Sequence, residues 1–195
     1  MITLASKSAS RAAILAAAGV AFAAVDSGVD EASAKARLAQ EGASPQVTAE
    51  RLAALKAGAV SRGRPGLVIG ADQTLELDGV LYDKATTKAE ARGRLLALRG
   101  RTHSLHTATA VAEDGRIVWE AMESPRLRMR SFSKAFLDDY LERAGSALTG
   151  SVGGYYLEGL GVQLFERIDG DYFAVLGLPL LPLLDFLRSR GALAP

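Results

Sequence analysis

The sequence has no cysteine, and its 195 residues include only two histidines and one tryptophan. Without cysteine, disulfide bonds, thiol nucleophiles and zinc–thiolate sites are excluded. A metal centre built on His103 and His106 is also disfavoured, because side chains three positions apart on a strand point to opposite faces. Any bound metal would therefore rely on carboxylates.

An excess of charge of one sign is also missing, since 23 Lys and Arg residues face 22 Asp and Glu residues. This balance gives no general argument for a nucleic-acid or membrane partner. The composition, 49% hydrophobic and 23% charged, is that of an ordinary globular protein. The length suits a single domain over residues 1–195 with a substantial core.

Long hydrophobic runs are absent as well. Residues 12–25, preceded by Lys7 and Arg11, resemble the short core of a signal peptide. The segment is mostly alanine, is interrupted by Gly19 as a helix C-cap would interrupt it, and is too short to span a bilayer. We therefore expect a cytoplasmic protein.

The most informative stretch is residues 67–84, LVIGADQTLELDGVLYDK. Its β-branched start, residues 67–69, predicts a short buried strand, and the small residues at 70–71 would let a ligand approach the backbone. We expect the strand to end there and Asp72 to lie in the following loop. Open α/β sheets bind ligands at that position, so Asp72 is a candidate for chemistry.

A β-hairpin is expected next, because Asp78-Gly79 is a strong turn signal between two apolar arms. The second arm leads to Lys84, so the stretch supplies an acid and a base. A plain hairpin with a solvated acid and a solvated lysine explains the same pattern, and spacing alone does not separate the two interpretations.

The remaining pattern predicts alternating strands and helices. Two long antiparallel strands in mid-chain favour a mixed α/β sheet over a purely parallel one. We expect strands at about 2–5, 22–25, 67–69, 75–77, 80–82, 103–112, 117–119, 125–130 and 163–168. We expect helices at about 10–18, 33–40, 45–61, 87–98, 133–143 and 179–190.

The Ser-rich turn between the first strand and the first helix is a possible phosphate seat, because free amides and the helix dipole favour anions there. Ser8 or Ser10 would cap the helix, with Arg11 in its first turn. A simple helix cap is the competing interpretation.

Three acids, Glu31, Asp72 and Glu158, are expected at loop positions, and the cations Arg11, Lys56 and Lys84 are possible partners. Carboxylates hold Mg²⁺ while it bridges to substrate phosphates, and cations stabilise a leaving phosphate. One carboxylate can also take the proton of an attacking water. This set favours a nucleotide or phosphate-ester hydrolase, and an α+β domain of unreadable function stays open.

Several short motifs follow one another in a characteristic order along nearly the whole chain. They are Leu4-Ala5-Ser6-Lys7-Ser8 with Arg11, Val29-Asp30-Glu31, Leu55-Lys56-Ala57, residues 68–72, Asp78-Gly79 with Lys84, Leu98, Gly100, His103 and Thr107, residues 153–159, and residues 177–179. Together they resemble the Maf family, the septum-formation-inhibitor-like nucleoside triphosphate pyrophosphatases. No single motif is decisive, whereas the ordered set is specific.

The resemblance implies an elongated Maf/ITPase-like fold, a mixed twisted sheet with flanking helices and a deep cleft between two lobes. It implies hydrolysis of a nucleoside triphosphate to the monophosphate and pyrophosphate with a divalent cation, Mg²⁺ or Mn²⁺. It also implies house-cleaning of noncanonical nucleotides, an effect on septum formation and a possible homodimer. The implied catalytic residues are Asp72, Lys84, Lys56 and Glu31, with Asp72 and Glu31 also holding metal. The implied substrate-binding residues are Ser6, Ser8, Ser10, Arg11, Gln73 and Glu158.

The departures from the family pattern concern the substrate. Gln73 stands where the dTTP/UTP branch has threonine, and Glu158 where it has glutamine, so both resemble the 7-methyl-GTP branch. The paired arginines are reduced to Arg11 alone, and the family's G-K-P is Asp83-Lys84-Ala85. A nucleotide-binding regulator of cell division with little turnover is therefore the alternative function.

Overall fold

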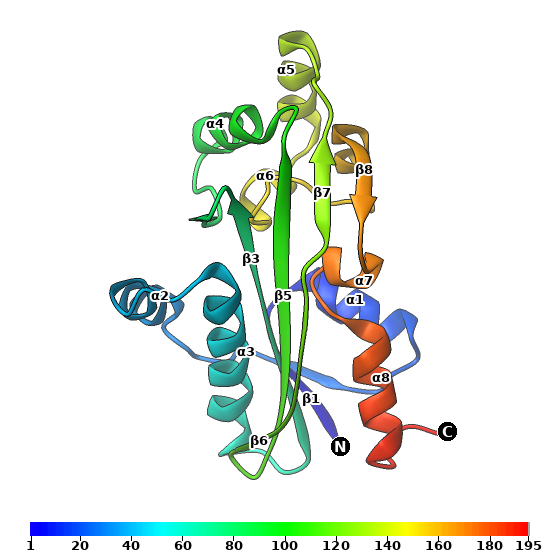
Figure 1. Ribbon diagram of the computed structural model, residues 1–195. Coiled ribbons are helices and arrows are strands. Elements are labelled where there is room, and N and C mark those ends of the chain that lie inside the picture. Colours follow the sequence, from blue (N-terminus) through cyan, green and yellow to red (C-terminus); the bar gives the residue numbers. More distant parts are fainter. Residues whose placement is uncertain (195) are drawn as a thin grey trace.

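The computed structural model describes residues 1–194. Within them an eight-stranded mixed sheet follows the order β2-β1-β3-β5-β7-β8, with β4 paired to β3 and β6 paired to β5 (Figure 1). The strands are β1 (Ile2–Ala5), β2 (Ala23–Val25), β3 (Leu67–Leu77), β4 (Val80–Tyr82), β5 (Thr102–Glu113), β6 (Arg116–Glu123), β7 (Arg126–Met129) and β8 (Phe165–Asp169). The mixed α/β class expected from the sequence is confirmed.

The helices flank this sheet on both sides. They are α1 (Ala9–Ala17), α2 (Glu31–Gln40), α3 (Pro45–Ser61), α4 (Lys88–Leu98), α5 (Lys134–Arg143), α6 (Ala147–Gly150), the 3-10 helix η1 (Leu160–Leu164), α7 (Tyr172–Val175) and α8 (Leu180–Ser189). The expected caps Ser44, Thr87 and Ser133 each accept a backbone N–H at the start of α3, α4 and α5. Even the longest helix between residues 1 and 194, the 17-residue α3, lacks the length and apolar character of a membrane span.

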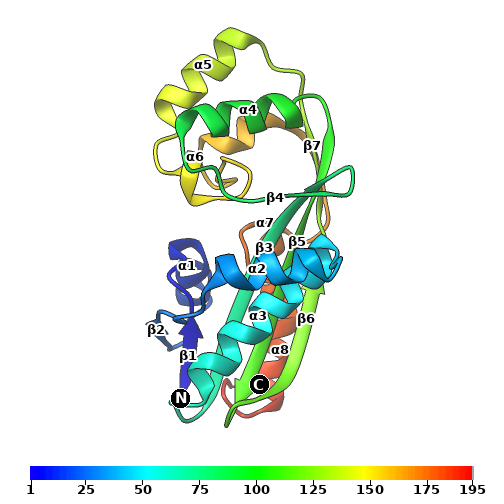
Figure 2. The ribbon, with the colours of Figure 1, turned by 90° about the vertical axis from the view of Figure 1, so that its left-hand side faces the viewer.

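Strands β3 and β5 form the long axis of the molecule and join two lobes. They pair antiparallel from Val68 opposite Ala112 to Glu76 opposite Ser104. In Figures 1 and 2 the lower lobe contains α1, α3 and α8, and the upper lobe contains α4, α5 and α6. Each lobe has its own core, because β3 contributes Ile69 to one hydrophobic cluster and Leu75 to another.

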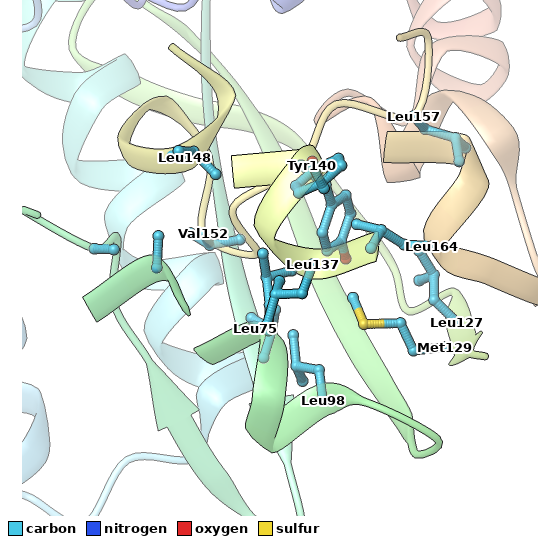
Figure 3. Packing of buried hydrophobic residues seen from close by; sticks show 14 of the residues in the cluster. Leu75, Leu98, Leu127, Met129, Leu137, Tyr140, Leu148, Val152, Leu157 and Leu164 are labelled. Atoms are coloured by element: carbon cyan, nitrogen blue, oxygen red, sulfur yellow. The ribbon is translucent and has the colours of Figure 1, made fainter. Parts of the chain in front are cut away.

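The upper core is filled mainly by leucines from strands and helices that are distant in sequence. Figure 3 shows Leu75 of β3 and Leu98 of α4 grouped with Leu137 of α5 and Met129 of β7. All four side chains are fully buried. The burial of about four such side chains, each contributing roughly 1.5–3 kcal/mol, fixes α4 and α5 over this end of the sheet.

The expectation that the strand after residue 67 ends before Asp72 is wrong. β3 continues to Leu77, and Asp72 lies in its middle, opposite Ala108 of β5. Gly70 permits close helix packing, because a Cβ there would lie 2.3 Å from the Ala53 carbonyl oxygen of α3. The small residue therefore serves the packing of α3 on the sheet.

Other local expectations are confirmed with small shifts. Asp78 and Gly79 both have positive φ, as a two-residue hairpin turn of the mirror type requires. The short α7 and α6 were missed, since four residues carry too little periodicity to be recognised. Trp119 packs on α8, where its ring stacks on Phe186 at a centroid distance of 5.2 Å.

Candidate active site

A cleft of about 1270 Å³ lies between the two lobes. Its lower wall comes from the start of α1, the loop before α2, and α3, and its upper wall from the segment after β4 and residues 150–158. All the site residues expected from the sequence line this cleft, namely Ser6, Ser8, Ser10, Arg11, Glu31, Lys56, Asp72, Gln73, Lys84 and Glu158. The expected deep cleft between two lobes is therefore present.

Lys56 joins two carboxylates at the floor of the cleft. Its Nζ donates to Asp72 Oδ1 at 2.7 Å and lies 2.9 Å from Glu31 Oε1. Lys56 and Asp72 are buried, with 6% and 8% of their side chains exposed, whereas Glu31 is 45% exposed. A buried ammonium needs this double pairing, because desolvation of an unpaired charge costs several kcal/mol.

The electrostatics of this trio keep Glu31 ionised. Burial raises the pKa of the Glu31 carboxyl, but the nearby charges of Lys56, Lys35 and Lys84 outweigh it, so the pKa lies below its ordinary value. The second oxygen of Asp72, Oδ2, is buried without a hydrogen-bond partner among residues 1–194. A buried carboxylate oxygen without a partner is costly, so a water, a proton or a cation would be stabilising at this position.

The start of α1 forms the wall opposite Glu158. Ser8 caps the helix by accepting from the Arg11 amide at 3.4 Å. The Arg11 side chain donates from Nε to the Gly177 carbonyl at 2.8 Å and from Nη1 to Ser6 Oγ at 3.3 Å. Burial lowers the pKa of Arg11 from its usual value while Asp72 opposes that shift, and the guanidinium stays charged.

Two contacts cross the cleft between the lobes. Ser10 of α1 donates to Glu158 of the upper wall at 3.4 Å. Lys35 of α2 forms an ion pair with Asp83, the residue before Lys84. Both contacts connect segments that a bound substrate would have to fit between.

Lys84 forms no ion pair in the part of the chain that the structure describes. Desolvation in the cleft lowers its pKa below the ordinary lysine value, and the neighbouring positive charge of Arg11 lowers it further. Arg11, Lys56 and Lys84 thus concentrate positive charge in one cleft, which is the arrangement that attracts a polyphosphate.

The residues expected to hold a divalent cation, Asp72 and Glu31, come together through Lys56. Between residues 1 and 194 no group of three or more His, Asp or Glu side chains has the geometry of a complete metal site. Mg²⁺ commonly takes one or two protein carboxylates and completes its shell with water and substrate phosphates. The unpartnered Asp72 oxygen and the exposed Glu31 carboxylate fit that manner of binding.

Sequence reasoning missed Lys35 and Asp83, because α2 and the β4–α4 segment meet only in the folded chain. The replacement of the family's glycine by Asp83 was the one signal available. Tyr155 also lines the cleft but is buried, and its hydroxyl shares a 2.6 Å hydrogen bond with His103. Tyr156 lines the cleft and is half-buried.

The two histidines point to opposite faces, as expected. His103 contacts Tyr155, and His106 contacts Glu76 at 2.8 Å and Ser124 at 2.8 Å. Neither histidine lines the cleft. They are therefore no part of the candidate site.

Comparison with known proteins gives one consistent result. A family model described as "Maf-like protein" matches residues 1–190. The chain is 60% identical to a nucleoside triphosphate pyrophosphatase of Caulobacter vibrioides over 192 residues, 98% of this chain and 96% of that protein. It is 52% identical to a protein of the same name from Paramagnetospirillum magneticum, over 98% of this chain and 100% of that one.

Proposed function

The chain belongs to the Maf-like protein family, and we propose that it is a nucleoside triphosphate pyrophosphatase. The observation that carries this proposal is the buried Lys56–Asp72 pair at the floor of a cleft that also contains Arg11 and Lys84. The names of its relatives in Caulobacter vibrioides and Paramagnetospirillum magneticum support the same activity.

In the proposed reaction a water attacks the α-phosphorus of the triphosphate. The bond from the α-phosphorus to the bridging oxygen breaks, and the products are a nucleoside monophosphate and pyrophosphate. Asp72 accepts the proton of the water through Oδ2, the oxygen that has no other partner among residues 1–194. Lys56 holds the other oxygen at 2.7 Å and so fixes the direction of the carboxylate.

Arg11 and Lys84 bind the β- and γ-phosphates in this proposal. Positive charge at these positions stabilises the pyrophosphate as it leaves, and it acts most strongly where water is excluded. Ser6, Ser8 and Ser10 lie at the same wall and supply hydroxyl groups to the phosphates. Asp72 and Glu31 would hold a divalent cation, Mg²⁺ or Mn²⁺, which neutralises phosphate charge when bound.

For the substrate we propose a modified guanine nucleotide such as 7-methyl-GTP. Glu158 lies on the upper wall of the cleft, and its carboxylate can only accept hydrogen bonds when ionised. A guanine edge presents N–H donors to such an acceptor. A cytoplasmic location, a homodimer and a role in septum formation stay predictions.

The test is pyrophosphate release with Mg²⁺ or Mn²⁺ across dTTP, UTP, CTP, GTP and 7-methyl-GTP. We expect turnover of 7-methyl-GTP far above the rest. A pyrimidine preference would overturn the substrate proposal and leave the mechanism intact. Folded protein that binds nucleotide and releases no pyrophosphate would overturn the enzyme proposal in favour of the regulator.

A further inference from the structure

Gln73 follows Asp72 directly, and the two side chains serve opposite faces of β3. Asp72 contacts Lys56 of α3, while the Gln73 amide nitrogen contacts the end of α7. That nitrogen lies 2.8 Å from Thr107 Oγ1, 2.9 Å from the Ala174 carbonyl oxygen and 3.2 Å from the Val175 carbonyl oxygen. Carbonyl oxygens only accept, so these contacts fix which end of the amide faces α7.

The carbonyls that Gln73 binds belong to the C-terminus of α7, where helical hydrogen bonds run out. Gly177 ends this helix with φ of +106°, and its amide donates to the Ala174 carbonyl at 3.0 Å. Leu178 donates back to Phe173 at 3.1 Å, which completes the Schellman pattern. Gln73 and Gly177 therefore share one acceptor, the Ala174 oxygen.

The same glycine holds the cleft arginine. The Gly177 carbonyl accepts from Arg11 Nε at 2.8 Å, and a Cβ on Gly177 would lie 3.5 Å from that nitrogen. The path from Gln73 to the guanidinium thus runs through one carbonyl and one glycine. Thr107 reinforces it, since its hydroxyl accepts from Gln73 and donates to Ala174 at 2.8 Å.

We propose that Gln73 is a positioning residue for Arg11: it holds the end of α7, and through Gly177 it sets the guanidinium for the phosphates. Both amide hydrogens are used inside the protein, so they are not available to read a nucleobase. This inference rests on the proposed function for the phosphate role of Arg11. The hydrogen-bond path itself is independent of that role.

The test compares Gln73→Leu and Thr107→Val with Thr109→Val as matched control. Thr109 lies two residues from Thr107 on the same face of β5, is equally buried, and its hydroxyl has no partner among residues 1–194. Each variant is assayed for the kcat and KM of every nucleotide in the panel. Each is also titrated with Mg²⁺-pyrophosphate, alone and combined with Arg11→Met.

We expect Gln73→Leu and Thr107→Val to weaken pyrophosphate binding and kcat/KM about tenfold, the effect of roughly 1.4 kcal/mol. The loss should be equal for every base, absent in Thr109→Val, and not additive with Arg11→Met. A changed order of nucleotide preference would overturn the proposal, because Gln73 would then read the base. Additive losses would overturn it too.

A second readout does not need catalysis or a ligand. The Arg11 Nε–H, held by Gly177 in the native protein, should be protected from exchange with water, and its NMR signal follows this directly. We expect Gln73→Leu and Thr107→Val to remove that protection and Thr109→Val to retain it. Full protection of the Arg11 Nε–H in Gln73→Leu would contradict the positioning role of Gln73. Failure of the wild type to release pyrophosphate would contradict only the proposed function.

Discussion

Lys56 and Asp72 come from different elements and meet at 2.7 Å beneath the cleft, with both side chains almost fully buried. Neither charge would be stable there alone. Glu31 provides the second carboxylate, 2.9 Å from the same ammonium, and is half exposed to the cleft. The Lys56–Asp72 pair joins α3 to β3. The charged floor of the cleft is therefore also part of the interface where α3 packs on β3.

Replacing Asp72 with asparagine should abolish hydrolysis and leave the fold intact. Asparagine still accepts from Lys56 through its amide oxygen, and Glu31 still pairs with that ammonium, but no proton acceptor remains for the water. We expect kcat to fall about 10²–10⁴-fold with similar nucleotide affinity, measured by pyrophosphate release and calorimetry.

Glu76→Gln is the matched control for Asp72→Asn. Glu76 lies on the same face of β3, contacts His106, and is outside the cleft. Its variant should hydrolyse like the wild type. Wild-type turnover by the Asp72 variant would remove Asp72 from the base role.

Replacing Gly70 with alanine should separate α3 from the sheet. The new Cβ would lie 2.3 Å from the Ala53 oxygen and 2.5 Å from the Ala57 nitrogen, and neither backbone atom can move alone. We expect a loss of about 3 kcal/mol in the free energy of unfolding, measured by urea denaturation. Activity should fall as well, because Lys56 lies on the displaced helix.

Gly58→Ala is the control on that helix. A Cβ there meets nothing within 4 Å, so the substitution should stabilise the protein by about 0.5–1 kcal/mol through helix propensity. Equal stability of the two alanine variants would contradict the packing role assigned to Gly70.

His103 should make the protein less stable in acid. Burial lowers the pKa of His103 to about 4 from its ordinary value of 6.5, so between those two pH values the unfolded chain binds a proton that the folded chain does not. The contribution of neutral His103 to the free energy of unfolding is therefore complete above pH 6.5 and is lost as the pH drops from 6.5 to about 4. The expected loss is about 3 kcal/mol.

The measurement is unfolding by urea across this pH range, for the wild type and for His103→Gln. Glutamine retains a polar group near Tyr155 and does not titrate. The gap in stability between the two proteins should therefore narrow as the pH falls. A gap that stays constant would show that His103 does not titrate in this window.

Lys35 and Asp83 should show a small coupling across the cleft. Partly exposed ion pairs contribute about 0.2–1 kcal/mol, and salt screens them. A double-mutant cycle with Lys35→Met and Asp83→Asn, measured by thermal or urea unfolding, should give a coupling of that size at low ionic strength. The coupling should vanish near about 1 M salt, where the screening length is about 3 Å. A coupling free energy that does not change with salt concentration would mean that packing, and not charge, connects α2 to the segment after β4.

Much of the local structure followed from the sequence. Helix caps and tight turns depend on residues within a few positions, so the neighbouring residues suffice to predict them. Examples are the helix starts at Ser8, Ser44 and Ser133 and the turn at Asp78-Gly79. The resemblance carried by the ordered motifs also named ten of the residues that line the cleft.

The tertiary structure decided what those residues do. The strand through Asp72 continues because β5 pairs with it from Val68 to Glu76, and the partner of Asp72 in that pairing, Ala108, is distant in sequence. Separation in sequence also concealed three further contacts: the close packing of α3 on Gly70, the hydrogen bonds of Gln73 to α7, and the ion pair of Lys35 with Asp83. Local propensity carries no information on such contacts, because their free energy depends on which distant groups the fold brings together.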